Sequence, residues 1–200
     1  MHITKRVILS ALSLALALGL AACGPSGPDM PMEAAVDGHT ITLGRTTMED
    51  LVSWGYEVNS AGRQDVAYED DKYIYFQYSL SKGAGNQFWV SVYTPYYGGT
   101  NINQEAQEAA ESGIVYSVIL RKSSTEKVSA VYNGKDIQDM TFDDAKAWGA
   151  LAQADASRVT WALTAAQGTL RFEAENTSSQ DLYSLQVSMG KRVFEKMQEE

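Results

Sequence analysis

The sequence is poor in the residues that most often carry chemistry: it has one cysteine and two histidines in 200 residues. A lone thiol excludes an intramolecular disulfide, and too few thiols and imidazoles are present for a typical zinc site. It also lacks a glycine-rich phosphate loop and a G-x-S-x-G nucleophile elbow. We therefore predict a protein that is not an enzyme, with no catalytic residue, no metal and no cofactor.

Two segments could still carry chemistry, and both have plainer interpretations. His39 lies beside a predicted hairpin turn, where a solvated histidine is expected. Glu69, Asp70 and Asp71 are consecutive acids, but they lack the alternating ligand spacing and the glycine of a calcium loop. A residual enzyme hypothesis would depend on His39.

Long apolar runs are also missing except at the N-terminus. Lys5 and Arg6 precede an apolar segment over residues 7–20, which is typical of a signal peptide. Leu20-Ala21-Ala22-Cys23 follows and resembles the lipobox of bacterial lipoproteins. The resemblance implies cleavage before Cys23, acylation of its thiol, and an envelope location facing away from the cytoplasm, with the lipid bilayer as a partner. An uncleaved anchor or ordinary secretion would leave this thiol without a role.

Residues 23–33 contain three of the four prolines and are predicted to form a flexible tether after the signal peptide of residues 1–22. Removal of the leader leaves 14 of the 16 basic residues against 25 acidic ones. A nucleic-acid-binding protein usually presents a basic face, so we expect no nucleic-acid partner.

The rest of the chain contains an internal echo. TMEDLVSWG at 47–55 matches TFDDAKAWG at 141–149, with an offset of 94. Upstream, VDGHTI at 36–41 parallels YNGKDI at 132–137, with an offset of 96. The DG and NG pairs favour two-residue hairpin turns, because such turns need positive φ at both central positions. We interpret the echo as two tandem repeats, at 34–126 and 127–200.

Each echoed segment has the pattern of a short helix. Thr47 and Thr141 are suited to the N-cap, where a hydroxyl accepts from a free backbone N–H, and acids follow in the first turn. Gly55 and Gly149 are suited to the left-handed position that ends a helix. The tryptophan before each glycine is expected to pack in the core.

After each helix the apolar period becomes two, which predicts antiparallel strands. The predicted class is α+β: in each repeat a hairpin, a helix on a small antiparallel sheet, and three strands. The predicted strands are 73–80, 87–94, 114–120, 158–164, 170–174 and 183–189, with a further helix over 104–111 inside a long insert at 95–113.

This organisation resembles the β-lactamase inhibitory protein and related small outer-membrane assembly lipoproteins. Leu43-Gly44-Arg45-Thr46 is similar to their Leu/Phe-Gly-Met-Thr helix entry, with Arg45 in place of methionine. The second unit keeps Met140-Thr141 but has no glycine there, and the inhibitor's disulfides are absent. The resemblance implies helices on one face of a sheet and a partner protein on the other.

Strand alternation separates two sheet faces in the first unit. The apolar set formed by Ile74, Phe76, Tyr78, Phe88, Val90 and Val92 is expected to face the helix. The opposite face would present aromatic partner-binding residues, with two more as a rim: Tyr73, Tyr75, Trp89, Tyr93, Tyr96 and Tyr97. The matching face of the second unit is expected to be solvated: Arg158, Thr160, Arg171, Glu173, Ser184 and Gln186.

Tyrosine and tryptophan often anchor protein interfaces. The leading hypothesis is an envelope lipoprotein that binds another envelope or extracellular protein, or assists assembly, through these aromatics. The alternative is a solute- or glycan-binding lipoprotein that uses the same residues. The aromatics could instead be covered by the 95–113 insert or by packing between the units.

Overall fold

The computed structural model describes residues 30–62, 73–83, 87–95, 102–122, 129–155 and 157–200, and they form an α+β fold rich in strands. We call residues 30–122 the first half and residues 129–200 the second half. Leader, Cys23 and most of the tether lie outside the described residues. Within the described part, no helix is both long enough and apolar enough to span a membrane.

The first half contains a hairpin, a helix and four antiparallel strands, with one more helix before the last strand. Its elements are β1 (Glu33–Val36), β2 (His39–Thr42), α2 (Met48–Ser53), β3 (Glu57–Gly62), β4 (Tyr73–Ser81), β5 (Gln87–Pro95), α3 (Ile102–Ser112) and β6 (Ile114–Arg121).

The second half repeats this order without a counterpart of α3. Its elements are β7 (Ala130–Tyr132), β8 (Lys135–Asp136), the 3₁₀ turn η2 (Ile137–Asp139), α4 (Phe142–Ala147), β9 (Leu151–Gln153), β10 (Thr160–Thr164), β11 (Gly168–Glu173), β12 (Ser184–Met189) and the terminal helix α5 (Lys191–Glu199). The six predicted strands and the helix in the insert are confirmed to within two residues, whereas β3, β9 and α5 were not predicted.

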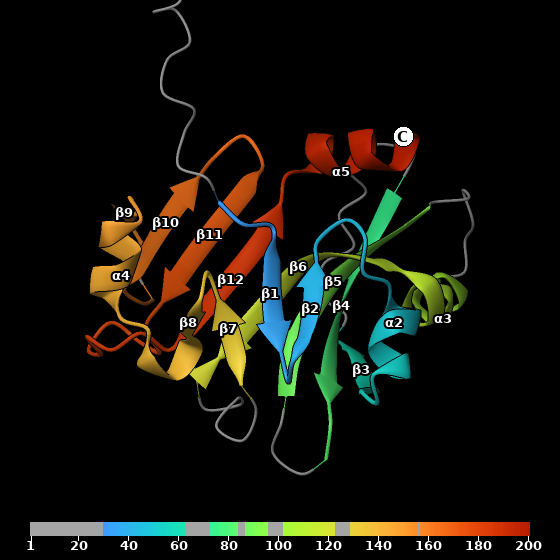
Figure 1. Ribbon diagram of the computed structural model, residues 1–200, viewed down its shortest axis with the longest axis horizontal. Coiled ribbons are helices and arrows are strands. Elements are labelled where there is room, and N and C mark those ends of the chain that lie inside the picture. Colours follow the sequence, from blue (N-terminus) through green and yellow to red (C-terminus); the bar gives the residue numbers. More distant parts are fainter. Residues whose placement is uncertain (1–29, 63–72, 84–86, 96–101, 123–128, 156) are drawn as a thin grey trace, which may run out of the picture.

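Both sheets run across the two halves, which corrects the expectation of a separate small sheet in each unit. The larger sheet has the order β3-β4-β5-β6-β12-β11-β10-β9, and the smaller has the order β2-β1-β7-β8 (Figure 1). The halves meet through the antiparallel pairs β6–β12 and β1–β7. In each of the two sheets, a strand of one half therefore pairs with the open edge strand of the other half.

The predicted hairpin turns are confirmed. Asp37 and Gly38 have φ of 52° and 80°, and Asn133 and Gly134 have φ of 49° and 74°. Positive φ at both central positions matches the right-handed twist of the flanking strands. The turns therefore set the register of β1 with β2 and of β7 with β8.

The predicted helix starts are confirmed as reciprocal capping boxes. Asp50 N donates to Thr47 Oγ1 at 3.2 Å, and Thr47 N donates to Asp50 Oδ2 at 2.8 Å. In the second half, Asp144 N donates to Thr141 Oγ1 at 3.4 Å, and Thr141 N donates to Asp144 Oδ2 at 2.7 Å. Each box satisfies two N–H groups that the first turn of a helix leaves unpaired.

The predicted helix ends are also confirmed. Gly55 and Gly149 have φ of 89° and 91°, the left-handed conformation that glycine adopts at low cost. Trp54 and Trp148 precede them as C-cap residues, and both are half-buried against the core.

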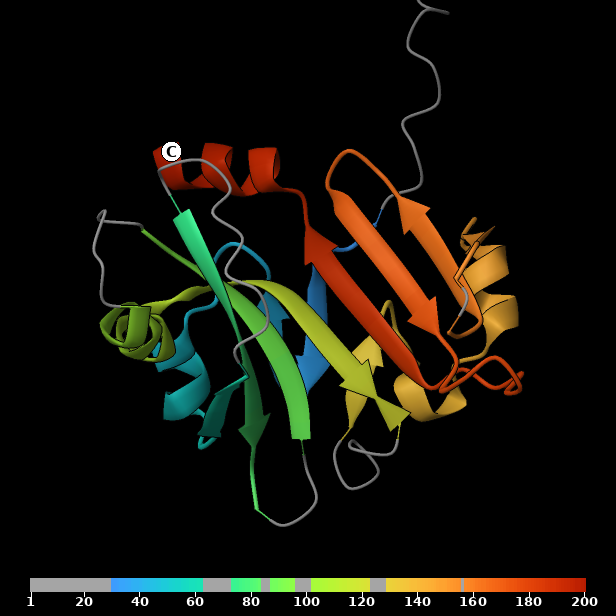
Figure 2. The same ribbon diagram turned by 180° about the vertical axis from the view of Figure 1, so that it is seen from behind.

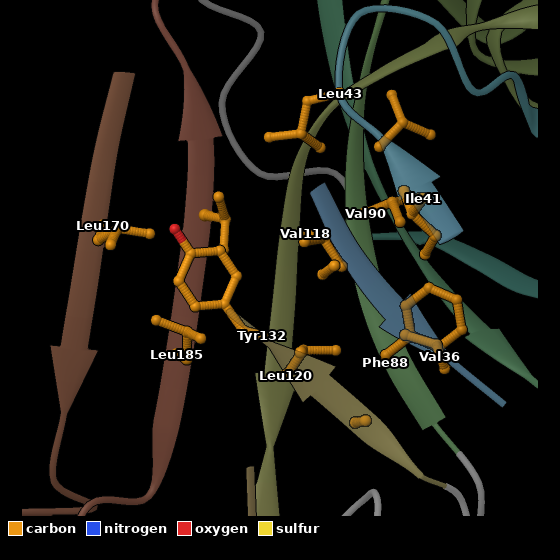
Figure 3. Packing of buried hydrophobic residues seen from close by; sticks show 14 of the residues in the cluster. Val36, Ile41, Leu43, Phe88, Val90, Val118, Leu120, Tyr132, Leu170 and Leu185 are labelled. Carbon is orange, nitrogen blue, oxygen red and sulfur yellow. The ribbon is translucent and has the colours of Figure 1, made fainter. Parts of the chain in front are cut away.

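The core fills the space between the two sheets (Figure 3). Val36 and Ile41 of the small sheet lie over Phe88 and Val90 of the large one, while Tyr132 lies beside Leu185. The predicted inward set of the first half is confirmed for its described side chains: Phe76, Tyr78, Phe88, Val90 and Val92 are at most 6% exposed.

Candidate interaction surface on the large sheet

The large sheet has a second face, turned away from the small sheet, which we call the outer face. Figure 2 shows it from the front, and no described helix or strand lies across its middle. Alternation along β4 and β5 directs Tyr75, Trp89 and Tyr93 to this face, since the residues between them are buried in the core. The alternation of side chains along β4 and β5 therefore determines which aromatic residues reach the candidate surface.

One end of the outer face carries a tyrosine cluster. The rings of Tyr93 and Tyr116 stack with centroids 4.0 Å apart, and Tyr75 meets both edge-on at 6.4 and 6.1 Å. Phe194 of α5 packs on Tyr93 at 4.7 Å. Tyr75 and Tyr116 remain half-buried, whereas Tyr93 is only 7% exposed.

A second aromatic site lies further along β5. The guanidinium of Arg121 stacks over the half-buried ring of Trp89, 3.9 Å from its centroid. Ile119 pairs with Trp89 across β5 and β6 and is also half-buried. Such a cation–π contact holds a long side chain in place and offers an apolar and a cationic group together.

Polar residues separate these two aromatic sites. Ser91 lies between Trp89 and Tyr93 on β5 and pairs with Ser117. The hydroxyls of Ser117 and Ser188 are 2.8 Å apart, and Gln186 Nε2 donates to Ser117 Oγ at 3.1 Å. The described part of the outer face thus has two aromatic sites joined by a hydrogen-bonded polar row.

The second half presents ion pairs on this face. Arg171 contacts Glu173 at 2.7 Å and Asp155 at 3.3 Å, and Arg158 contacts Glu173 at 3.1 Å. Hydrogen bonds from Ser157 hold the pKa of Asp155 below its ordinary value. The prediction of a polar face is confirmed.

The expectation that the whole of this polar face is solvated is wrong. Thr160 and Ser184 are each only 4% exposed. Ser184 Oγ donates to Glu173 Oε2 at 3.5 Å, so the paired charges enclose part of the polar row.

The six predicted partner-binding residues fall into three groups. Tyr75 and Trp89 lie half-buried on the outer face, and Tyr93 lies on it but is covered by Phe194. The Tyr73 side chain, Tyr96 and Tyr97 lie outside the described residues.

The cover expected from the 95–113 insert is not found in its described part. There α3 lies on the opposite side of the sheet, where Tyr78 Oη donates to the Ala106 carbonyl at 2.6 Å. The described residues that cover Tyr93 come instead from the unpredicted helix α5.

Three residues of the surface were missed from the sequence, namely Tyr116, Ile119 and Arg121. Tyr116 reaches the outer face because of a β-bulge: Ser91 pairs with Ser117 and Val92 with Val115, which leaves Tyr116 extra in β6. Arg121 follows the alternation of β6 and was detectable, had that strand been aligned with β5.

The residual enzyme hypothesis finds no geometric support at His39. Its ring stacks on Trp54 with centroids 4.7 Å apart and planes 8° apart, in place of the solvated setting expected. No group of three or more metal-ligating side chains occurs within the described ranges, and the acidic run at 69–71 lies outside them.

Comparisons of the chain with protein-family models, curated proteins and solved structures found no match.

Proposed function

We propose that this chain is a lipid-anchored protein of a bacterial envelope that binds another protein through the outer face of its large sheet, without catalysis. The observation that carries the proposal is the half-buried Trp89 with Arg121 stacked on it, on a face whose middle no described helix or strand crosses. Tryptophan and arginine are the residues most enriched at interface hot spots.

The shape of this surface favours a protein over a small ligand. Small-molecule sites are usually concave, whereas the described part of the outer face is one face of a β-sheet. Arg121 also covers one side of the Trp89 ring, and Tyr93 is buried, so two of the described aromatics of the glycan alternative are poorly placed to stack on a sugar. Tyr75, Tyr116 and Ile119 add apolar area around the hot spot.

We further infer that the two halves are tandem repeats that arose by duplication, with units at 34–126 and 127–200. Ala35 pairs with Val131, which lies 96 residues later, the same offset that relates the two hairpin turns. The strand orders of both sheets are also symmetric about the junction between the halves. Equivalent residues thus meet across an internal two-fold relation.

The binding proposal is tested by photo-crosslinking in cells that make the full-length chain. A crosslinking amino acid replaces Gln77 on the outer face or, as control, Val52, which is 51% exposed on α2. We expect a discrete adduct from position 77 that Trp89→Ala weakens about tenfold or more. Leu151→Ala, at a side chain 70% exposed on β9, should leave it unchanged.

Two results would oppose the proposal. One is the same adduct pattern from positions 52 and 77, and the other is an adduct unaffected by Trp89→Ala when circular dichroism shows both variants folded. The anchor is tested separately by growing the cells with a labelled fatty acid, which should label the wild-type chain and not Cys23→Ser, because acyl chains on that thiol would hold the protein at the membrane at about 0.8 kcal/mol per buried CH₂. Equal labelling of the two chains would contradict acylation of Cys23.

A further inference from the structure

The helix α5 leaves the large sheet where β12 ends. Figures 1 and 2 show it at one end of that sheet, beside the first half. It belongs to neither sheet, so it can move without breaking a strand pair. Gly190 joins it to β12, and the Gly190 N–H donates to the Gln167 carbonyl at 2.8 Å. The chain can therefore hinge just after Gly190, because few backbone conformations are closed to glycine.

Few side chains hold α5 in place. Of its nine residues only Phe194 is buried, and its ring packs on Tyr93 with centroids 4.7 Å apart. Gln198 Nε2 donates to the Gly44 carbonyl at 3.0 Å. The partly buried apolar side chains of α5 are Val193 and Met197. The position of the helix therefore depends chiefly on the burial of one phenyl ring.

The local chemistry of α5 does little to stabilise a helix. Its N-cap, Gly190, makes no side-chain hydrogen bond, and Lys191 and Arg192 lie at the end of the helix dipole that favours acids. Lys196 suits the last turn, but Glu199 follows it there. Helices of this length are marginal in water without tertiary packing. The shorter α2 and α4 each have a capping box and a glycine stop, whereas α5 depends mainly on its packing.

The buried ring of α5 covers an aromatic residue that strand register directs to the outer face. Tyr93 lies there in contact with Tyr75 and Tyr116, yet it is only 7% exposed. Removal of Phe194 would uncover the side of Tyr93 on which it packs and enlarge the aromatic area on the face that carries Trp89. Tyrosine is enriched at interface hot spots, so α5 hides a part of the surface suited to a partner.

We propose that α5 is a mobile cover, which closes over Tyr93 in the free protein and is displaced by the partner. The partner then places an aromatic or large aliphatic side chain where Phe194 lay, since that place already accommodates a phenyl ring. This rests on the proposed function, because the same partner is involved. The cover weakens binding, since the apparent affinity falls with the fraction of molecules that are open.

Hydrogen exchange on the full-length chain in detergent tests the opening without any partner. We expect the amides of residues 195–199 to exchange about tenfold or more faster than the paired amides of β12, because the cover opens while the sheets stay folded. Phe194→Ala should speed exchange in α5 by about a further 10- to 100-fold, the value of burying a phenyl ring. Phe194→Leu keeps an apolar side chain and should have a smaller effect.

A second variant favours the closed state. Gly190→Ser with Arg192→Glu supplies a cap and an acid in the first turn, and it should slow exchange in α5 by about 2- to 5-fold. A Cβ at Gly190 would meet nothing closer than 3.5 Å, so the serine fits. Thermal unfolding should show this variant to be at least as stable as wild type, which separates its effect on binding from any loss of folding.

The crosslinking assay at position 77 then measures the effect on binding. Phe194→Ala should raise the yield of the adduct about twofold or more, and Gly190→Ser with Arg192→Glu should lower it by a similar factor. The cover is overturned, and the binding proposal stands, if α5 and β12 exchange at the same rate or if the adduct forms equally in all variants. Absence of an adduct from every variant would overturn both.

Discussion

The two halves share a backbone plan but are filled differently. Both have a positive-φ turn, a capped six-residue helix, a glycine stop and four antiparallel strands. The first half adds α3 over its inner face, whereas the second leaves a cavity there. The turns and helix caps thus specify the path of the chain in each half. The side-chain volumes and the presence or absence of an inserted helix determine whether the inner face is packed or has a cavity.

The helices also dock by different contacts. Trp54 stacks on His39 in the first half, whereas Trp148 packs against Tyr132 and Phe172 at 5.7 and 5.9 Å in the second. Equivalent positions in the chain therefore serve the same purpose, holding a short helix on the sheet, with different partners.

The largest expected effect on the free energy of unfolding comes from the residue that each short helix buries in the core. Leu51 is fully buried beneath α2, and the equivalent residue beneath α4 is the fully buried Ala145. Leu51→Ala should lower the free energy of unfolding by about 2–5 kcal/mol, because it creates a cavity in a packed core. Ala145→Leu should cost about 1–3 kcal/mol through overpacking. Urea unfolding followed by circular dichroism measures both, and a near-zero cost at Leu51 would contradict the packing described.

The helix stops should respond equally in the two halves. Gly55→Ala and Gly149→Ala each place a side chain at positive φ and should cost about 1–2 kcal/mol. The space around both is open: an added Cβ would meet only Lys82 Cε at 3.6 Å near Gly55, and nothing within 4 Å near Gly149. Thermal unfolding should show matching losses, and clearly unequal losses would break the equivalence of the stops.

The capping boxes predict a smaller and again matched effect. Thr47→Ala and Thr141→Ala should each cost about 1 kcal/mol, because a backbone N–H loses its acceptor at the helix start. Thr→Ser at either position keeps the acceptor and should recover most of the loss. If the serine variants are as unstable as the alanine variants in urea, the methyl group and not the cap is responsible.

The smallest expected effect is a pH dependence of stability that arises from an ion pair in the second half. Lys135 Nζ donates to Asp144 Oδ1 at 2.6 Å and lowers the pKa of that carboxyl. A lowered pKa in the folded state stabilises the protein above the ordinary value of about 4, and this contribution is lost as pH falls through the lowered value. The pair is partly exposed, so Lys135→Met should cost less than about 1 kcal/mol at pH 7.

Urea unfolding at pH 7 and below pH 3 checks this dependence. The difference between wild type and Lys135→Met should shrink at the lower pH, where Asp144 becomes protonated. A difference for Lys135→Met that does not change with pH would rule out the ion pair as its cause.

Local features of the fold could be predicted because each depends on a few neighbouring residues. The DG and NG turns, the threonine caps and the glycine stops follow from backbone conformations that few residues tolerate. The six strands that the sequence predicted were long enough for alternation to be visible. The short β9 has three exposed residues and thus no apolar pattern.

The arrangement between elements could not be predicted in the same way. Within each sheet the two halves are joined by pairs of residues that lie far apart in the sequence, such as Ala35 with Val131. The candidate surface was half visible: alternation placed Tyr75 and Trp89, but burial of Tyr93 depends on Phe194, about a hundred residues away. The Tyr116 position depends on a bulge, which composition does not encode.

The β6–β12 pair has a consequence for the order of folding. Residues 114–121 can complete their pairing only after residues 184–189 have been made, close to the end of the chain. Until then β6 has an open edge without its partner strand, and such edges readily pair with other chains. Long-range pairing of this kind also slows folding. Loss of the last strand should therefore leave an aggregation-prone chain, and not a shorter stable domain.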